Sequence, residues 1–152
     1  GPTALVFSRQ SLEPAIRDDE QVALISKGGY VLLDHPDPKL LFIATGSEVN
    51  IAIQAARELK VAGISARVVS MPCAELFCLQ DKEYRDRVLP PNLSNRIAIE
   101  ALHKDYWYKF VGLSGIVIGM ETFGESAPGD VLMQEFGFTK KNLVNVAKGM
   151  LS

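Results

Sequence analysis

Arg9 is the residue with the clearest capacity to bind a ligand, because it follows the short apolar run from Ala4 to Ser8. We interpret that run as a buried strand, which places Arg9 just beyond its carboxyl end. Ligands of open α/β sheets gather beyond that edge, and a planar guanidinium can hold a phosphate with two parallel hydrogen bonds. Residue type and position alone still favour a surface arginine, with a phosphate ligand as the alternative.

The loop Thr45-Gly46-Ser47-Glu48 is a second candidate, since it follows an apolar run and opens a helical pattern. A helix start of this kind presents free backbone N–H groups and the positive end of the helix dipole, which can bind an anion. The loop lacks the glycine spacing of a dinucleotide-binding loop and the lysine of a P-loop. We therefore interpret it as a well-capped helix start with Ser47 as the N-cap, and keep a weak anion site as the alternative.

The histidines and cysteines form no pattern typical of catalysis or metal binding. His103 follows a strand end, where it could face a cleft, and His35 lies in a proline-rich turn that we expect to be solvated. Neither has the neighbours of a nucleophilic triad. Cys73 and Cys78 are too few for a disulfide framework, and no second Cys or His pair completes a zinc site. We expect two buried or half-buried thiols and no metal ligands.

Tyr106-Trp107-Tyr108 is a cluster of three successive aromatic residues. Three successive side chains cannot all point the same way from a helix, so we expect some to face the core and others to face a partner. Aromatic residues are enriched at protein interfaces, and both interpretations stay open. The charged run from Asp81 to Arg87 instead has the alternation of an exposed helical face.

Composition limits the class of protein to which these residues belong. The chain has 152 residues, 47% hydrophobic and 22% charged, which is typical of one globular domain. A net charge of −2 without clustered basic residues argues against nucleic-acid and membrane partners. No apolar run approaches the ~20 residues that span a bilayer, and the N-terminus lacks the pattern of a signal peptide. We expect a soluble, cytoplasmic protein.

Strands alternating with helices must position the candidate residues. Apolar runs predict strands at 30–33, 40–44, 66–70, 96–100 and 116–120, the first of them at a sheet edge. Helical spacing predicts a long helix from Ser47 to a cap at Gly63, two short helices within 73–89, and helices over 127–136 and from Thr139 to the end. A turn of helix over 21–26 follows a surface linker at 11–20. This order predicts an α/β fold, a mostly parallel sheet with helices on both faces.

Blocks of sequence along nearly the whole chain resemble the last third of transketolases. Each block alone is weak, but together they keep the family's order. They include Gly1-Pro2-Thr3-Ala4-Leu5, Ser8-Arg9-Gln10, Lys27-Gly28-Gly29-Tyr30, Ile43-Ala44-Thr45-Gly46-Ser47-Glu48-Val49, Asp105-Tyr106-Trp107-Tyr108-Lys109 and Phe123-Gly124-Glu125-Ser126-Ala127-Pro128. Departures fall mostly in loops at 34–39, 73–79 and 102–104, and they put in doubt any ligand role for Cys73, Cys78 or His103.

The resemblance implies a three-layer α/β/α sandwich with a five-stranded mixed sheet. It implies that residues 1–20 are the end of the middle, pyrimidine-binding domain and a linker, and that 21–152 are the transketolase C-terminal domain. The resemblance also implies that Gly1-Pro2 is native sequence, in a chain cut between two domains. In the family, the arginine of the Ser-Arg-Gln motif binds the substrate phosphate, so the resemblance assigns that role to Arg9.

The family's activity is transfer of a two-carbon ketol unit from a ketose phosphate to an aldose phosphate in the pentose phosphate pathway. The full enzyme is a homodimer that uses thiamine diphosphate and Mg²⁺ or Ca²⁺. The cofactor, metal and catalytic residues of the family have no counterpart in this chain, so we expect the chain alone to be inactive and to bind no cofactor. Two alternatives remain: a stand-alone anion-binding or regulatory module, and a subunit-docking domain like that of 2-oxo-acid dehydrogenase beta subunits.

Overall fold

The computed structural model describes residues 4–5 and 10–152. Its strands are β1 (Tyr30–Leu33), β2 (Leu40–Ala44), β3 (Ala66–Ser70), β4 (Arg96–His103) and β5 (Ile116–Met120). Its α-helices are α1 (Asp19–Leu24), α2 (Glu48–Val61), α3 (Ala74–Cys78), α4 (Lys82–Val88), α5 (Tyr108–Val111), α6 (Gly129–Glu135) and α7 (Lys140–Leu151). Two 3₁₀ turns, η1 (Ile25–Lys27) and η2 (Lys104–Trp107), follow α1 and β4.

The five strands form one mixed sheet in the order β1-β3-β2-β4-β5. β1 pairs with β3 in the antiparallel sense, and β3, β2, β4 and β5 run parallel to one another. β1 lies at an edge, as predicted. The predicted mostly parallel, five-stranded mixed sheet is therefore confirmed.

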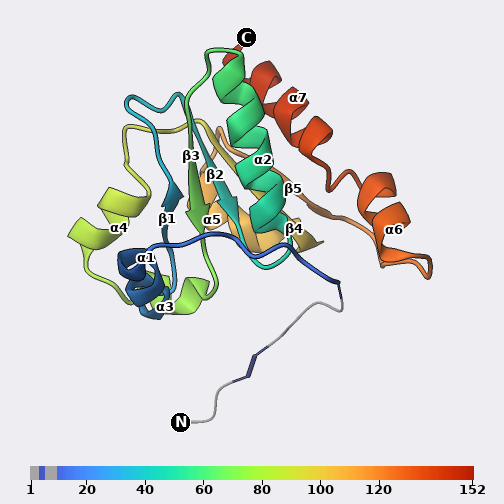
Figure 1. Cartoon of the computed structure of the whole chain (residues 1–152), viewed down its shortest axis with the longest axis horizontal. Helices are drawn as coiled ribbons and strands as arrows, with labels where there is room; N and C mark the ends of the chain where they lie inside the picture. The colour runs from blue at the N-terminus through green and yellow to red at the C-terminus, as the bar shows by residue number, and fades with distance from the viewer. Residues whose placement is uncertain (1–3, 6–9) are drawn as a thin grey trace.

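Helices cover both faces of this sheet, because β2 sends alternate side chains to two separate cores. Leu40, Phe42 and Ala44 pack in one core with residues of α2 and α7. Leu41 and Ile43 pack in the other, with residues of α3, α4 and α5. All five residues of β2 are buried. Figure 1 shows α2 and α7 side by side in front of the sheet, so the predicted three-layer α/β/α sandwich is confirmed.

Element boundaries differ from the sequence predictions where local chemistry intervenes. α1 begins earlier than predicted because Asp18 and Gln21 form a capping box. α6 begins at Gly129 rather than Ala127, since the residue before Pro128 is disfavoured in a helix. β4 runs three residues beyond Glu100, through a register shift that pairs His103 with Met120. α7 begins as predicted, with Thr139 accepting a hydrogen bond from the Asn142 backbone N–H.

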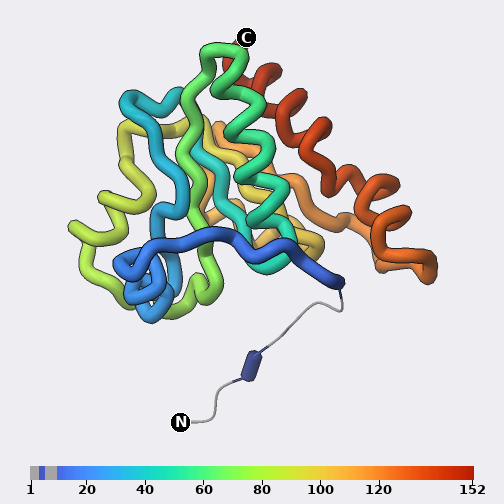
Figure 2. Tube along the Cα trace, viewed as in Figure 1, coloured from blue at the N-terminus to red at the C-terminus, as the bar shows by residue number. Residues whose placement is uncertain are grey.

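The segment that leads into the domain crosses the carboxyl edge of the sheet. Residues 11–18 contain no helix or strand, and Figure 2 shows this blue segment passing in front of the start of α2. The Asn50 side chain on α2 donates a hydrogen bond to Glu13 O at 2.6 Å. The Arg17 guanidinium donates to the Tyr30 hydroxyl at 2.5 Å and to Ala15 O at 2.8 Å. The predicted surface linker is therefore fixed to the domain at two points.

Candidate functional site at the carboxyl edge of the sheet

The strand order creates a topological switch point between β2 and β4. The chain leaves β2 for β3 on one side, and β4 pairs with β2 on the other side. The carboxyl ends of β2 and β4 are neighbours, with Ala44 opposite Ile99. Crevices of this kind are where open α/β sheets bind ligands. The turn at 45–47 and the end of β4 therefore flank the candidate site.

Glu48 fills the helix start where the sequence allowed an anion. The predicted N-cap Ser47 makes no capping hydrogen bond to the helix backbone; its hydroxyl donates instead to Glu48 Oε2 at 3.0 Å. Glu48 is only 4% exposed. Burial raises its pKa, while hydrogen bonds from Ser47 and from the backbone of Glu48 and Ala101 act in the opposite direction. A bound anion would meet this carboxylate, so the anion-site alternative is disfavoured.

Glu100 lies across the switch point from Glu48, near the end of β4. The buried Trp107 indole donates from Nε1 to Glu100 Oε2 at 2.5 Å. Burial raises the pKa of Glu100, the Trp107 hydrogen bond lowers it, and the charge of Glu48 raises it further. Two carboxyl groups therefore interact at this edge. Sequence analysis missed the pair because the two residues lie in separate elements, and its one available signal was a Glu directly after the apolar run 97–99.

Glu100→Gln is expected to change how stability depends on pH. A folded-state pKa raised above the usual 4.5 means that the folded chain binds this proton more tightly than the unfolded chain. The resulting stabilisation is complete below pH 4.5 and is lost as the pH rises through the raised pKa. The free energy of unfolding of Glu100→Gln, relative to wild type, should therefore increase from pH 4.5 towards neutrality, as measured by urea unfolding at a series of pH values.

Glu58→Gln provides a control of opposite sign. Glu58 on α2 accepts a hydrogen bond from Lys140 Nζ of α7 at 2.8 Å, which lowers its pKa. That stabilisation is present above pH 4.5 and lost as the pH falls through the lowered pKa. The Glu58→Gln protein should thus lose stability relative to wild type as the pH rises towards 4.5, and its difference from wild type should stay constant from pH 4.5 to neutrality. A Glu100→Gln difference that stays constant across the same pH series would contradict the buried carboxyl pair.

A hollow of about 640 Å³ lies beyond the carboxyl ends of β4 and β5, and most of its lining is apolar. His103 is on its wall, so this histidine does face a cleft, and the Asp105 backbone N–H donates to its Nδ1 at 3.5 Å. Gln10 also lines the hollow. Sequence analysis did not predict a cavity here, because its walls come from four separate segments of the chain.

Arg9 and most of the predicted strand at 4–8 lie outside the residues that the structure describes. Ala4 and Leu5 are described; both are exposed, and neither belongs to a strand. Their predicted burial is wrong within this chain. The structure leaves the role of Arg9 as a prediction.

The aromatic triplet and the two cysteines are divided between the core and the surface of the domain. Trp107 is buried, whereas Tyr106 and Tyr108 are 40% and 43% exposed, so the aromatic triplet does divide between core and surface. Cys73 is half-buried, but Cys78 is exposed, so the predicted burial of both thiols is wrong for Cys78. Cys78 is exposed because it ends α3, whose buried residues are Ala74 and Phe77.

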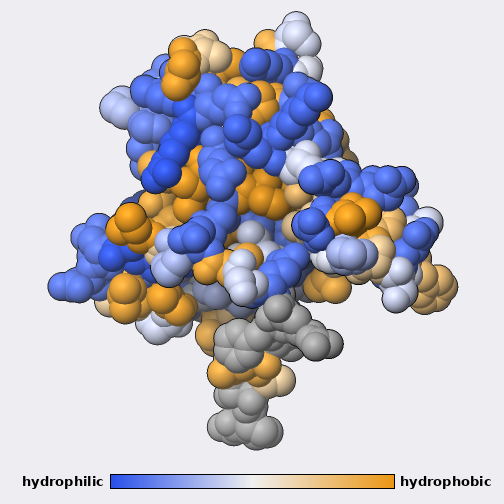
Figure 3. Space-filling view, turned by 45° about the vertical axis from the view of Figure 1, so that its right-hand side comes forward, coloured by the Kyte–Doolittle hydropathy of each residue, from blue (hydrophilic) through white to orange (hydrophobic). Residues whose placement is uncertain are grey.

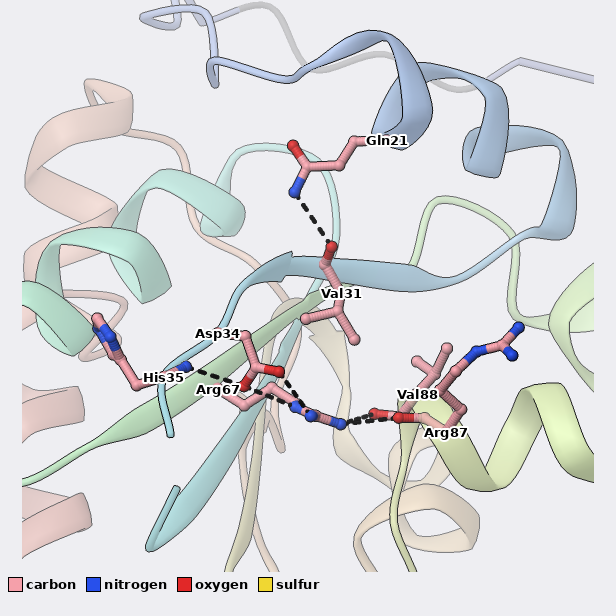
Figure 4. A network of polar contacts seen from close by, with 7 residues as sticks. All are labelled: Gln21, Val31, Asp34, His35, Arg67, Arg87 and Val88. Carbon is pink, nitrogen blue, oxygen red and sulfur yellow. Dashed lines mark hydrogen bonds and ion pairs between the residues drawn. The ribbon is translucent and has the colours of Figure 1, made fainter. Parts of the chain in front are cut away.

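His35 belongs to a polar network at the opposite edge of the sheet (Figure 4). Its side chain is half-buried rather than fully solvated, and its backbone N–H donates to Asp34 Oδ1 at 3.0 Å. Arg67 Nε and Nη2 donate to the same carboxylate at 3.0 and 2.7 Å, and Nη1 donates to Arg87 O at 2.8 Å. Gln21 Nε2 donates to Val31 O at 3.3 Å, which covers part of the edge strand. This network joins β1, β3 and α4 and offers no reactive arrangement.

The described residues do not fit a metal or a diphosphate. Within 4–5 and 10–152, no group of three or more His, Cys, Asp or Glu side chains could hold a metal ion. The helix start that most resembles a phosphate site holds the Glu48 carboxylate. No helix in this part of the chain is long and apolar enough to cross a membrane.

Comparison with known proteins gives one consistent family. Residues 28–139 match the family model described as the transketolase-like TK C-terminal domain. Transketolase 2 of Aliivibrio fischeri is 55% identical over 153 aligned residues, which cover 100% of this chain and 23% of that protein. The chain therefore spans about a quarter of the length of this relative.

Solved structures agree with the sequence match. The transketolase from Leishmania mexicana superposes with a TM-score of 0.79 and 37% identity, covering 85% of this chain and 18% of that one. A Pichia stipitis transketolase, solved in complex with sedoheptulose-7-phosphate, gives a TM-score of 0.78 and 31% identity over 85% of this chain and 18% of that one. The chain belongs to the transketolase family, as its C-terminal domain.

Proposed function

We propose that this chain is the C-terminal part of an enzyme that transfers a two-carbon ketol unit from a ketose phosphate to an aldose phosphate. The observation that carries the proposal is 55% identity to a transketolase along the whole chain. The described residues supply a complete two-sided core but no metal cluster. The role of this part is therefore to support the fold, the dimer and the substrate phosphate site, and the isolated chain is inactive.

The chemistry of the full enzyme comes from groups held elsewhere in the polypeptide. Thiamine diphosphate supplies a stabilised carbanion when bound, together with Mg²⁺ or Ca²⁺. Sugar phosphates are the substrates, consistent with the sedoheptulose-7-phosphate complex of the Pichia stipitis protein. The enzyme is a homodimer in the cytoplasm. Residues 1–20 end the middle domain and form the linker, and 21–152 form the C-terminal domain, a division supported by the irregular backbone at 11–18 before α1.

Arg9 is the residue of this chain that we assign to the substrate. It is followed by Gln10, which lies at the carboxyl edge of the sheet. A guanidinium that donates two parallel hydrogen bonds suits a sugar phosphate, which is dianionic near neutral pH. Both reactants carry such a group, so one arginine could orient donor and acceptor in turn.

Arg9→Ala in the full-length enzyme should raise KM for phosphorylated sugars more than it lowers kcat. Losing a charge-assisted contact costs about 1.5–3 kcal/mol, which corresponds to roughly a 10–150-fold loss in kcat/KM. Steady-state kinetics with a phosphorylated and an unphosphorylated aldose acceptor, each paired with the same unphosphorylated ketose donor, would measure the effect, which should be confined to the phosphorylated acceptor.

Arg85→Ala is the matched control, since Arg85 is exposed on α4, far along the chain from the proposed site. It should leave both acceptors unaffected. Unchanged KM for phosphorylated sugars in Arg9→Ala would remove the phosphate role. Ketol transfer by the 152-residue chain alone, with thiamine diphosphate and Mg²⁺ added, would contradict the proposed division of labour.

A further inference from the structure

The segment from Glu121 to Val131 leaves an unusual amount of apolar surface uncovered. Every residue in it is exposed, and the Phe123 side chain is 97% exposed. α6 (Gly129–Glu135), which begins within this segment, has no buried residue, and Figure 1 shows it standing away from the sheet. In Figure 3, apolar atoms reach the surface on this lobe, at the right of the view. Contiguous apolar surface of this kind marks a contact with another protein surface.

The hollow described above is the concave part of the same surface. Its apolar walls come from β5, from the segment after it, from α6 and from the residues that follow α6, through Met120, Phe123, Leu132, Met133, Phe136 and Phe138. Its charged rim is already paired in part, because Glu121 forms an ion pair with Lys104. Among the described residues that line it, none is a buried charged side chain that could bind a sugar or a phosphate. Its chemistry suits apolar side chains of another protein surface rather than a polar small molecule.

The path of the linker identifies which protein surface reaches this hollow. Gln10 lies in its wall, and the following residues are fixed to the domain by the bonds of Asn50 to Glu13 and of Arg17 to Tyr30. The described polypeptide therefore enters the domain at the wall of the hollow, at Gln10. The Aliivibrio fischeri relative has about three quarters of its length outside the matched region, and the family model names that region C-terminal.

We infer that the hollow and the segment at 121–136 receive the domain that precedes this one in the same polypeptide, with Phe123 as the inserted anchor. The inference rests on the proposed function in one respect, namely that a transketolase-like chain precedes residue 1. A buried aromatic anchor in a tethered contact fixes the position of the linker, and with it the residue next to Gln10. The surface would thus set the geometry of the segment that carries Arg9.

The test uses the full-length enzyme with a photoreactive benzoyl-phenylalanine in place of Phe123. Irradiation should yield a cross-link within one polypeptide, and peptide mass spectrometry should place it on a residue that precedes Gly1. The control is the same substitution at Leu113. This residue is fully exposed in the turn before β5, at the amino end of the strand whose carboxyl end lines the hollow. It should give no such cross-link.

Hydrogen exchange of full-length variants tests the energetics. In Phe123→Asp, amides at 121–136 should exchange about ten-fold faster or more than in wild type, while Leu113→Asp should leave them unchanged. Exchange equal to wild type in Phe123→Asp would overturn the inference. A cross-link from position 123 to residues 10–152 of a second copy would also overturn it, and would assign the surface to self-association.

These readouts do not depend on catalysis. A full-length protein that shows the expected cross-link but no ketol transfer would refute the proposed function and leave the docking surface standing. An active enzyme without the cross-link would refute the docking surface and leave the proposed function standing.

Discussion

Trp107→Ala is expected to lower the free energy of unfolding of the domain by about 3–5 kcal/mol, the usual cost of truncating a buried tryptophan. Trp107 is 2% exposed, and its ring centroid lies 5.7 Å from that of Phe110. It also donates the hydrogen bond to Glu100. The substitution therefore creates a cavity in one core and removes a donor from a carboxyl group that burial already disfavours as an anion.

Urea unfolding followed by circular dichroism would measure this loss, since Trp107 is the chain's one tryptophan and fluorescence disappears with it. Tyr108→Ala is the matched control: Tyr108 is the next residue in the sequence and 43% exposed. Its effect should stay within about 0.5 kcal/mol. Equal losses of unfolding free energy in the two variants would contradict the division of the triplet into a buried Trp107 and an exposed Tyr108.

Trp107→Phe separates the hydrogen bond from the packing. Phenylalanine keeps most of the apolar contact but has no N–H, so Glu100 loses the donor that lowers its pKa. The cost should be about 1–2 kcal/mol. Combining Trp107→Phe with Glu100→Gln should recover part of that loss at neutral pH, because the amide carries no buried charge.

The core of the fold could be predicted because burial on both faces leaves a continuous apolar signature. The runs at 40–44 and 66–70 coincide with β2 and β3, and β2 is completely buried. The ends of helices and strands that depend on side-chain chemistry were harder to predict from the sequence. The capping box of Asp18 moved one helix start and Pro128 moved another, while β4 continued past Glu100 only because a register shift let His103 pair with Met120.

The candidate site was less predictable because its residues come from separate elements, which only the folded sheet brings together. Ser47 has the residue type of a cap, but its backbone is helical, with φ −65° and ψ −30°, rather than extended as a capping residue requires, and its hydroxyl donates to the buried Glu48 carboxylate. The interaction between Glu48 and Glu100 depends on which strands are neighbours, and spacing along the chain does not contain that information. The phosphate role of Arg9 came from resemblance alone, and residue chemistry favoured a surface arginine.

Gly28→Ala is expected to destabilise the domain by about 3 kcal/mol or more, through two independent costs. In the structure Gly28 has a φ of +83°, and a Cβ there would lie 2.3 Å from Cys73 O and 2.5 Å from Phe77 N. A left-handed alanine costs about 1–2 kcal/mol, and overpacking against fixed backbone adds about 1–3 kcal/mol.

Gly63→Ala isolates the first of these costs, because Gly63 has nearly the same φ of +80° but nothing within 4 Å of an added Cβ. It should cost about 1 kcal/mol. The backbone around Gly28 cannot easily move aside, since Cys73 N–H donates to Gly28 O at 3.0 Å and ties the turn to the start of α3. The two variants, compared by urea unfolding at one pH, should thus differ by about 2 kcal/mol or more. Equal losses would mean that α3 shifts freely, and that the contact between this turn and α3 contributes little to the stability of the domain.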